Sequence, residues 1–461
     1  MTDPLTQLAA LAGRERYDGV TIARQPPALA TRFQADEAAA AVIAATAAEA
    51  ADLWRMRTGQ TQTVEVAARE AAASLISFMF QRFEDPARAA VRDPPVTAAD
   101  GFFRSGDGRW VYLHPSFPES SRAMLQLLGC ENSREAVTAT VAGWEAQALE
   151  DAIAEAGVCG AMARTPQEWD ASEQGQAMAR LPLVEVVRIG DAPPKPLPAS
   201  GDSPLSGVKV LDLTRVLAGP ACARALAQHG AEVLHITSPN LPSIPPFVSD
   251  TGHGKRSAFL DLKTEADHGR LLALLDDADI FSQGYRLGGL DRLGLSPEAL
   301  AARRPGLIHV SINCYGHEGP WAGRPGWEQL AQTVTGMAHV HGGEAGPTIQ
   351  PAAVNDYTTG YLAALGAMIA LRRRAVEGGS WRVRVSLVQT ARWVRELGIA
   401  GPERLAAVQP FSAEELAGYS LHEDGGFGPV SFLRPPVRLS ATPARWTEPT
   451  RPLGSDPPAW V

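Results

Sequence analysis

Short apolar runs alternate with amphipathic stretches in the second half of the chain, and this alternation predicts strands followed by helices. The first unit is a strand at 208–213, a loop at 218–220, a helix ending at 228 and a strand at 231–236. Further strands are predicted at 258–262, 279–282, 307–313 and 380–387, with helices at 265–277, 297–303 and 359–374. This pattern predicts an α/β fold with a parallel sheet covered on both faces, whose ligands bind beyond the carboxyl ends of the strands.

The front of the chain has a different pattern, in which an Ala-rich helix at 35–56 turns into a strand. The last predicted helix and strand of the parallel-sheet region repeat this arrangement. A shift of 319 positions superposes Val64 to Val66 on Val383 to Val385, and Gly59 on Gly378. We therefore expect an internal duplication of one helix–turn–strand unit, with a generic turn common to both places as the alternative.

Composition narrows the class of protein. The chain has 461 residues, of which 45% are hydrophobic and 20% charged, as in an ordinary globular protein with more than one core. Lys and Arg number 42 against 51 Asp and Glu, a net charge of −9 that disfavours a nucleic-acid partner. An anionic ligand would need a local basic patch.

Four cysteines lie far apart without CxxC spacing, so we expect scattered buried thiols and neither a disulfide framework nor a metal site. The first residues lack a basic stretch followed by an apolar core, and no apolar run approaches 18 residues. We expect a soluble, cytoplasmic protein with no membrane partner.

Six segments then carry a resemblance to a known family. They are PLSGVKVLDLTRVLAGP at 204–220, GKRS with LDLK at 254–263, GYRLGGLDRLG at 284–294, SINCYGHEGP at 311–320, RPGW at 324–327 and NDYTTG at 355–360. In this order they resemble the class III CoA-transferases, a family that includes formyl-CoA and carnitine CoA-transferases and the related α-methylacyl-CoA racemases. Segments at 101–110 and 164–169 resemble the family's small domain, which normally follows the nucleotide-type fold but precedes it here.

The resemblance divides the chain and implies its fold. We expect an α/β protein whose parallel-sheet, Rossmann-like CoA-binding domain follows a smaller α+β domain placed N-terminally. The predicted parts are an N-terminal helical segment with the duplicated unit (1–95), the small α+β domain (96–190), a Pro-rich linker (191–204), the CoA-binding catalytic domain (205–400) and a C-terminal return segment (401–461). Family members are interlocked homodimers, which implies a possible homodimer here.

Asp356 matches the family's nucleophilic Asp, which attacks an acyl-CoA thioester and becomes an aspartyl-CoA thioester before a carboxylic acid takes up the CoA. The residue precedes a predicted helix, where the helix N-terminus favours an ionised carboxylate and offers N–H donors to an oxyanion. A carboxylate nucleophile needs no separate base. The alternative role is that of an N-cap residue.

The resemblance also implies a CoA site. Basic residues that match positions near the nucleotide and phosphates are Lys255, Arg256 and Arg292, with Arg215, Tyr285 and Arg286 flanking the same loops. Val216, Leu217 and Ala218 form the loop that lies against CoA in relatives. For each basic residue, a solvated surface position is the alternative. Two positions depart from the family: Leu217 stands where some transferases have a polar amide, and Gly284 where many relatives have Asn.

Other candidate positions weaken rival interpretations. The racemase positions for acid and base correspond to Trp327 and His114, and indole cannot exchange a proton in this way. His317 is expected to be a solvated loop residue. The 319-residue shift places Glu37, beside Asp36, opposite Asp356, and we expect helix-end charges there. A further loop, at 106–108, could cover the intermediate, but a hairpin turn is favoured.

We therefore expect a CoA-transferase that acts on an acyl-CoA and a small carboxylate, with coenzyme A as substrate and product and no permanently bound cofactor or metal. An acyl-CoA racemase or isomerase and a non-catalytic acyl-CoA-binding protein remain as alternatives.

Overall fold

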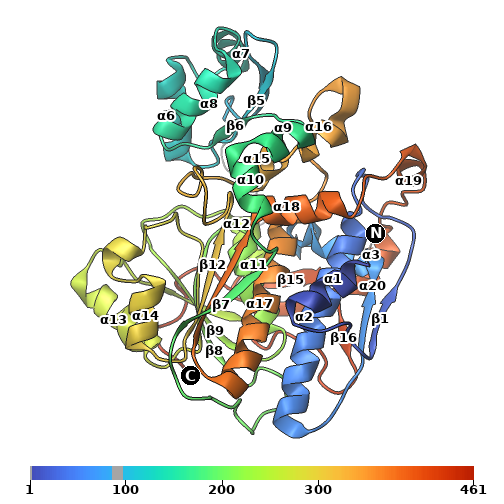
Figure 1. The fold of residues 1–461 in the computed structure, drawn as a ribbon, viewed down its shortest axis with the longest axis vertical. Helices are drawn as coiled ribbons and strands as arrows, with labels where there is room; N and C mark the ends of the chain where they lie inside the picture. Colours follow the sequence, from blue (N-terminus) through green and yellow to red (C-terminus); the bar gives the residue numbers. More distant parts are fainter. Residues whose placement is uncertain (1–2, 86–96) are drawn as a thin grey trace.

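The computed structural model describes residues 3–85 and 97–461, and a seven-stranded sheet lies at its centre (Figure 1). Its strand order is β10-β9-β8-β11-β12-β13-β7. The strands are β7 (Glu185–Gly190), β8 (Lys209–Leu213), β9 (Glu232–Thr237), β10 (Lys255–Phe259), β11 (Ile280–Gln283), β12 (Ile308–Asn313) and β13 (Ser380–Ser386). Only β7 is antiparallel to its neighbour. The predicted mixed α/β fold with a mostly parallel sheet is confirmed.

Helices cover both faces of this sheet, which explains why its strands are apolar in consecutive positions. Val210 of β8 packs in the core shared with α11 (Ala218–Ala227) and α17 (Val354–Glu377). Its neighbour Leu211 packs on the opposite face, with leucines of α13 (Glu265–Leu275) and α14 (Pro297–Arg303).

Two predicted elements begin earlier in the structure than in the sequence pattern. The strand expected at 258–262 is β10, which runs from Lys255 to Phe259; the polar Lys255 side chain at its start is buried against Asp212. The helix expected from 359 is α17, which starts at Val354.

A strand–helix–strand unit occurs twice. β1 (Val20–Ala23) and β2 (Val64–Ala67) are parallel, and the 24-residue α2 (Ala35–Thr58) lies between them. β12 and β13 are also parallel, and the 24-residue α17 leads into β13 after three shorter helices. A helix follows the second strand in each unit, α3 (Ala68–Ser74) after β2 and α18 (Leu387–Glu396) after β13. α2 and α17 pack side by side, as the blue and orange helices of Figure 1 show.

The two units exchange strands. β7 follows the first unit along the chain but pairs antiparallel with β13 of the second. β16 (Arg438–Leu439) follows the second unit but pairs antiparallel with β2 of the first, which completes the sheet β1-β2-β16. The strand that follows each unit along the chain thus forms the edge of the sheet that contains the other unit.

A lobe with its own hydrophobic cluster stands at the top of Figure 1. It contains β4 (Gly101–Arg104), β5 (Trp110–Leu113), β6 (Gly160–Met162), α6 (Pro118–Leu128), α7 (Arg134–Val141) and α8 (Ala146–Glu155). β4 and β5 form the hairpin predicted around 106–108. α9 (Pro166–Ala171) and α10 (Glu173–Ala179) lead back to β7. The predicted boundary between residues 95 and 96 lies outside the described residues.

The remaining elements connect these parts. They are α1 (Pro4–Leu11), α4 (Ser77–Phe80), β3 (Arg82–Phe83), α12 (Pro245–Thr251), η2 (Asp291–Leu293), α15 (Glu328–Val334), α16 (Met337–Gly342), η3 (Gly343–Ala345), α19 (Pro402–Ala406), α20 (Ala413–Tyr419), β14 (Ser420–Gly425) and β15 (Gly428–Leu433). β3 pairs with β15, so the two halves of the chain meet in a third sheet as well.

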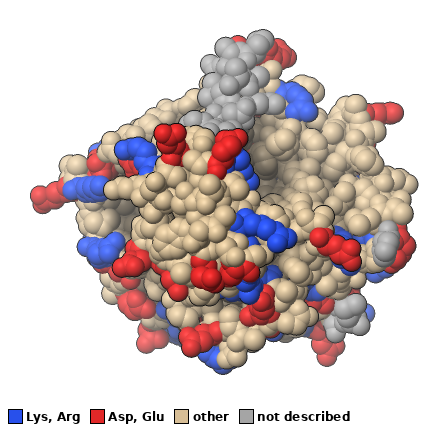
Figure 2. Space-filling view, turned by 90° about the horizontal axis from the view of Figure 1, so that it is seen from above, with Lys and Arg blue, Asp and Glu red and all other residues tan. Residues whose placement is uncertain are grey.

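Several negative findings apply to residues 3–85 and 97–461. None of their helices is both long and apolar enough to cross a membrane. They contain no group of three or more His, Cys, Asp or Glu side chains that could hold a metal ion. Cys159, Cys222 and Cys314 are buried free thiols, and Cys130 is half-buried. Figure 2 shows Lys and Arg side chains interspersed with Asp and Glu over the face seen from above.

Candidate active site

Asp356 lies in the first turn of α17, at the third helical position, and its side chain is buried. The residue that precedes the helix is Ala353, which makes no side-chain hydrogen bond to it. The N-cap alternative for Asp356 is therefore wrong, because the helix begins before this residue. The second turn of α17 packs closely on α11: a Cβ added at Gly360 would lie 2.7 Å from the Ala218 carbonyl oxygen.

Two cavities meet at Asp356. We call them cavity A, of about 330 Å³, and cavity B, of about 310 Å³. Both are lined by Phe117, Val216, Leu217, Trp327 and Asp356. The carboxyl group is thus reached from two sides.

Cavity A combines cationic groups with main-chain atoms. The residues that line cavity A but not cavity B include Arg215, Ala218, Gly219, Gly284, Tyr285, Arg286 and Arg324. Five predicted CoA-site residues, Arg215, Val216, Leu217, Ala218 and Tyr285, therefore come together here. Val216 has φ = +70°, the only such non-glycine among the described residues. A β-branched residue at positive φ is strained, and such strain gathers at functional sites.

The other predicted CoA-site residues lie apart from cavity A. Lys255 is buried, with its ammonium 3.0 Å from the Asp212 carboxylate and donating to the Pro220 carbonyl oxygen at 2.7 Å. Arg256 donates to the Ala459 carbonyl oxygen at 3.0 Å. Arg292 is exposed on η2. Their contacts with CoA stay predictions.

Glu328 is a second carboxyl group beside Asp356, and no motif in the sequence pointed to it. It is the first residue of α15 and is buried; its Oε1 accepts the main-chain N–H of Asn355 at 3.0 Å and the Gln332 amide at 2.8 Å. Burial raises the pKa of Glu328 to about 7. Only its place directly after Trp327 could have directed attention to it.

The same environment acts on Asp356. Burial raises the pKa of Asp356 well above its ordinary value, and the neighbouring Glu328 carboxylate raises it further. The helix N-terminus was expected to favour the ionised form of Asp356, and burial acts in the opposite direction and outweighs it.

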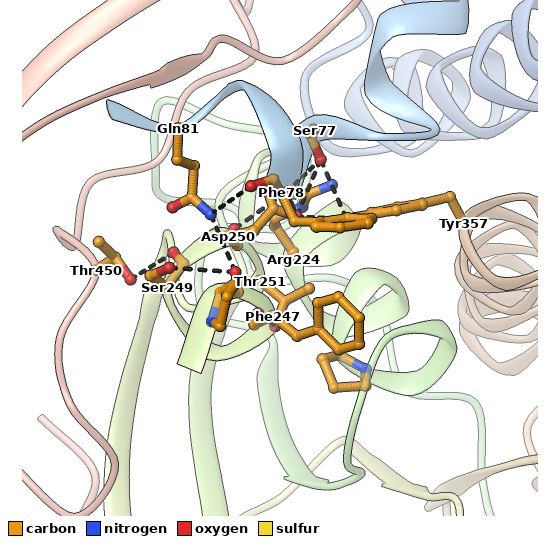
Figure 3. Close-up of polar contacts among 12 residues, drawn as sticks. Ser77, Phe78, Gln81, Arg224, Phe247, Ser249, Asp250, Thr251, Tyr357 and Thr450 are labelled. Atoms are coloured by element: carbon orange, nitrogen blue, oxygen red, sulfur yellow. Dashed lines mark hydrogen bonds and ion pairs between the residues drawn. The ribbon is translucent and has the colours of Figure 1, made fainter. Parts of the chain in front are cut away.

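A buried polar network holds the residue next to Asp356 (Figure 3). The Tyr357 hydroxyl donates to Asp250 Oδ2 at 2.7 Å, and the same oxygen accepts Arg224 at 2.7 Å and Ser77 at 2.9 Å. These four side chains come from α17, α12, α11 and α4 and are all buried. The network therefore fixes the first turn of α17 against three other helices, which sequence patterns did not predict.

Comparison with known proteins now places the chain. The sequence model described as CoA-transferase family III matches residues 8–192 and 205–400. The chain belongs to this family.

Its relatives are named for CoA transfer. An acyl-CoA transferase of Gibberella moniliformis is 36% identical over 324 residues, covering 65% of this chain and 57% of the relative. The probable fatty acyl-CoA transferase Rv3272 of Mycobacterium tuberculosis is 33% identical over 202 residues, 41% of this chain and 51% of the relative. The succinyl-CoA:glutarate CoA-transferase of Homo sapiens is 36% identical over 180 residues, 36% of this chain and 41% of the relative.

A crystal structure of Rv3272 superposes with a TM-score of 0.41 at 30% identity, over 42% of this chain and 57% of that one. The chain spans about half the length of the curated relatives it matches.

The two positions that the sequence matched to the racemase acid and base are Trp327 and His114. Trp327 lies at the junction of the two cavities, and its ring is 5.8 Å from that of Phe117. His114 lines cavity B with Nδ1 2.9 Å from Asp100. The expectation of a solvated His317 is wrong: its Nε2 lies 2.9 Å from Ser311 Oγ, and burial lowers its pKa to about 3.

The counterpart of Asp356 in the first unit is engaged elsewhere. Glu37 holds the same position in α2 as Asp356 in α17, since the two helices begin at Ala35 and Val354. Arg404 binds Glu37 at 2.8 Å and Asp36 at 3.0 Å. Both acidic residues thus lie in the first turn of α2, as expected, and form an ion-pair cluster.

Proposed function

We propose that the protein transfers CoA between an acyl-CoA thioester and a carboxylic acid through a covalent intermediate on Asp356. The observation that carries the proposal is the position of the Asp356 carboxyl group between a cavity with three arginines and a second cavity without Lys or Arg among its described lining residues. One side suits the CoA portion, whose phosphates are anionic, and the other suits the acyl portion.

The chemistry requires no redox partner. A carboxylate oxygen of Asp356 attacks the thioester carbonyl, the C–S bond breaks, and a mixed anhydride and CoA thiolate result. The thiolate attacks the Asp356 carbonyl, which releases the first acid as its carboxylate and leaves an aspartyl-CoA thioester. The acceptor carboxylate then attacks this thioester, and the returning thiolate forms the new acyl-CoA and regenerates Asp356.

Main-chain groups of α11 support the charged intermediates. Ala218 and Gly219 open α11 at the wall of cavity A, and the first N–H groups of a helix have no acceptor within it. They stabilise an oxyanion that forms close to Asp356. Arg215, Arg286 and Tyr285 lie along the same wall and hold the CoA portion, with Lys255, Arg256 and Arg292 as further predicted contacts.

Glu328 sets the protonation of the nucleophile. Burial raises the pKa of both carboxyl groups, and the neighbouring Glu328 charge raises that of Asp356 further, so the pair favours holding a proton. When Glu328 holds this proton, Asp356 is ionised and competent to attack. The ionised Asp356 then attacks the acyl carbonyl while the neighbouring Glu328 carries no charge.

Exchange of CoA between unlike acids tests the proposal. Acetyl-CoA, hexanoyl-CoA and succinyl-CoA are each incubated with a panel of free acids, and new thioesters are measured by mass spectrometry. The native protein and Glu37→Gln form new thioesters, whereas Asp356→Asn forms none. Exchange that persists in Asp356→Asn contradicts the proposal, as does deuterium uptake at the acyl α-carbon without exchange, which would indicate an isomerase.

A further inference from the structure

Cavity B has walls of apolar and aromatic side chains. The apolar residues that line it are Ile76, Phe78, Met79, Phe117, Val216, Leu217, Ile244, Phe247, Trp327, Ile349, Pro351, Ala352 and Ala353. Its volume of about 310 Å³ lies at the small end of the range for ligand sites. A compact apolar group fits this lining.

One wall of cavity B is formed by Phe78 and Phe247, and contacts between their two helices hold it in place. Phe78 of α4 and Phe247 of α12 meet edge to face, with ring centroids 4.8 Å apart (Figure 3). Directly beside them, the Ser77 hydroxyl donates to Asp250 at 2.9 Å, which joins the same two helices. The two rings therefore form a fixed surface before any ligand enters, and a fixed surface selects by shape and polarity.

No Lys or Arg is among the described residues that line cavity B. Its basic side chain is His114, whose Nδ1 already lies 2.9 Å from the Asp100 carboxylate. The acidic residues of the lining are Asp356 and Glu328. A second carboxylate on a ligand would thus be desolvated beside acidic groups without a cationic partner.

Two of the three amide side chains that line cavity B, Gln332 and Gln350, already bond within the protein. Gln332 donates to Glu328 at 2.8 Å and accepts the main-chain N–H of Gln350 at 2.9 Å. The side-chain oxygen of Gln350 accepts Thr31 at 2.7 Å. The third amide, Gln329, is uncharged and cannot replace a missing cation, and a buried charge without an opposite charge beside it is strongly disfavoured.

We infer that cavity B selects the acyl group of a monocarboxylic acid with an apolar alkyl or aryl body and rejects dicarboxylic acids. The inference rests on the proposed function, since it assigns the acyl side of that same site. Relatives such as the human succinyl-CoA:glutarate CoA-transferase are named for dicarboxylic acids. The lining of cavity B does not suit dicarboxylic acids, so this chain takes a different class of acyl group from those relatives.

Binding of matched thioesters tests the inference without turnover. Butanoyl-CoA and succinyl-CoA differ by one terminal methyl or carboxylate group, and both are titrated by calorimetry into Asp356→Asn, which cannot form the covalent intermediate. Butanoyl-CoA binds at least about tenfold more tightly. Equal binding, or tighter binding of succinyl-CoA, overturns the inference.

A cation introduced into cavity B gives a second test of the inference. Ile349→Arg places a guanidinium in the lining of cavity B and shifts the affinity ratio toward succinyl-CoA by at least about tenfold. Val376→Arg, at an exposed position near the far end of α17, leaves the ratio unchanged. A ratio that is the same in both variants contradicts the inference.

Native-protein exchange with butanoate and succinate separates this inference from the proposed function. Absence of exchange with every acid contradicts the transferase function, whereas the binding ratio judges the acyl preference by itself. Exchange that favours succinate over butanoate sustains the transferase function and overturns the acyl preference.

Discussion

Two buried carboxyl groups, Asp356 and Glu328, dominate the site at the scale of single residues. Each is withdrawn from water, which raises the pKa of both, and the Glu328 charge raises the pKa of Asp356 further. A nucleophilic carboxylate in such a place is less solvated than one on the surface, so less water must be removed before it attacks. The main-chain N–H of Asn355, bonded to Glu328, ties the two groups to one turn of α17.

The substitution Glu328→Gln tests this coupling. Removing the Glu328 charge lowers the pKa of Asp356, so the rise of kcat/KM with pH moves to lower pH in the variant. The measurement is the pH profile of CoA exchange. The control is Glu298→Gln, whose side chain is 66% exposed, and its profile matches the native one. A profile unchanged by Glu328→Gln contradicts the coupling.

The same variant has a stability signature of known sign. A carboxyl whose pKa rises from the ordinary 4.5 to about 7 on folding favours the neutral form, so its contribution to stability is lost as pH rises through that interval. Glu328→Gln removes this loss and gains up to about 3 kcal/mol over the native protein at pH 8, at about 1.4 kcal/mol per pH unit. Below pH 4 the two unfold at similar denaturant concentrations. If the difference in unfolding free energy between Glu328→Gln and the native protein does not grow with pH, the prediction is contradicted.

At the scale of elements, the contact between α11 and α17 positions Asp356 against the loop at Leu217. Gly360 permits this contact, because an added Cβ would lie 2.7 Å from both the Ala218 carbonyl oxygen and the Ala221 Cβ. α17 would have to move away from α11 to accept any side chain there. The geometry of the site thus depends on a residue that does not line either cavity.

Gly360→Ala is therefore expected to lower the free energy of unfolding by about 1–3 kcal/mol and to reduce CoA exchange. The matched control is Gly269→Ala in α13, where an added Cβ meets nothing within 4 Å. Alanine favours a helix over glycine, so this control is stabilised by about 0.5–1 kcal/mol. Chemical denaturation of both variants measures the difference, and equal losses would contradict the packing argument.

Most elements of the large sheet could be predicted from the sequence, because strands buried on both faces leave uninterrupted apolar runs. The start of α17 could not, because Asn355, Asp356 and Thr358 are residue types that favour caps and turns. Contacts from distant segments, such as Tyr357 with Asp250, hold that turn helical. Glu328 could not be predicted as a site residue either, because it comes to lie beside Asp356 only when α15 packs against α17.

At the scale of the whole molecule, the exchange of β7 and β16 makes the two halves of the chain mutually dependent. We propose that the repeated units arose by internal duplication. The carboxylate at the matching position of the first unit, Glu37, is paired with Arg404 and lines neither cavity, whereas Asp356 of the second unit lines both. Phe117 and His114, from the lobe that follows the first unit, complete the cavities around Asp356 of the second.

Cleavage of the linker tests this dependence. A protease site inserted in the exposed residues 198–202 divides the chain between β7 and β8. Because β7 pairs with β13 and β16 with β2, the two fragments stay together on native size-exclusion chromatography and separate only in denaturant. Separation under native conditions would contradict the exchanged arrangement.

The central claim, that Asp356 carries the acyl and CoA groups covalently, is tested most directly by peptide mapping after hydroxylamine trapping. Hydroxylamine attacks the aspartyl-CoA carbonyl, releases CoA and leaves a hydroxamate on the residue. With an active acyl-CoA, the account predicts a hydroxamate on Asp356 in the native protein and in Glu37→Gln, and none in Asp356→Asn. CoA exchange without modification of Asp356, or modification of Glu37 instead, would contradict it.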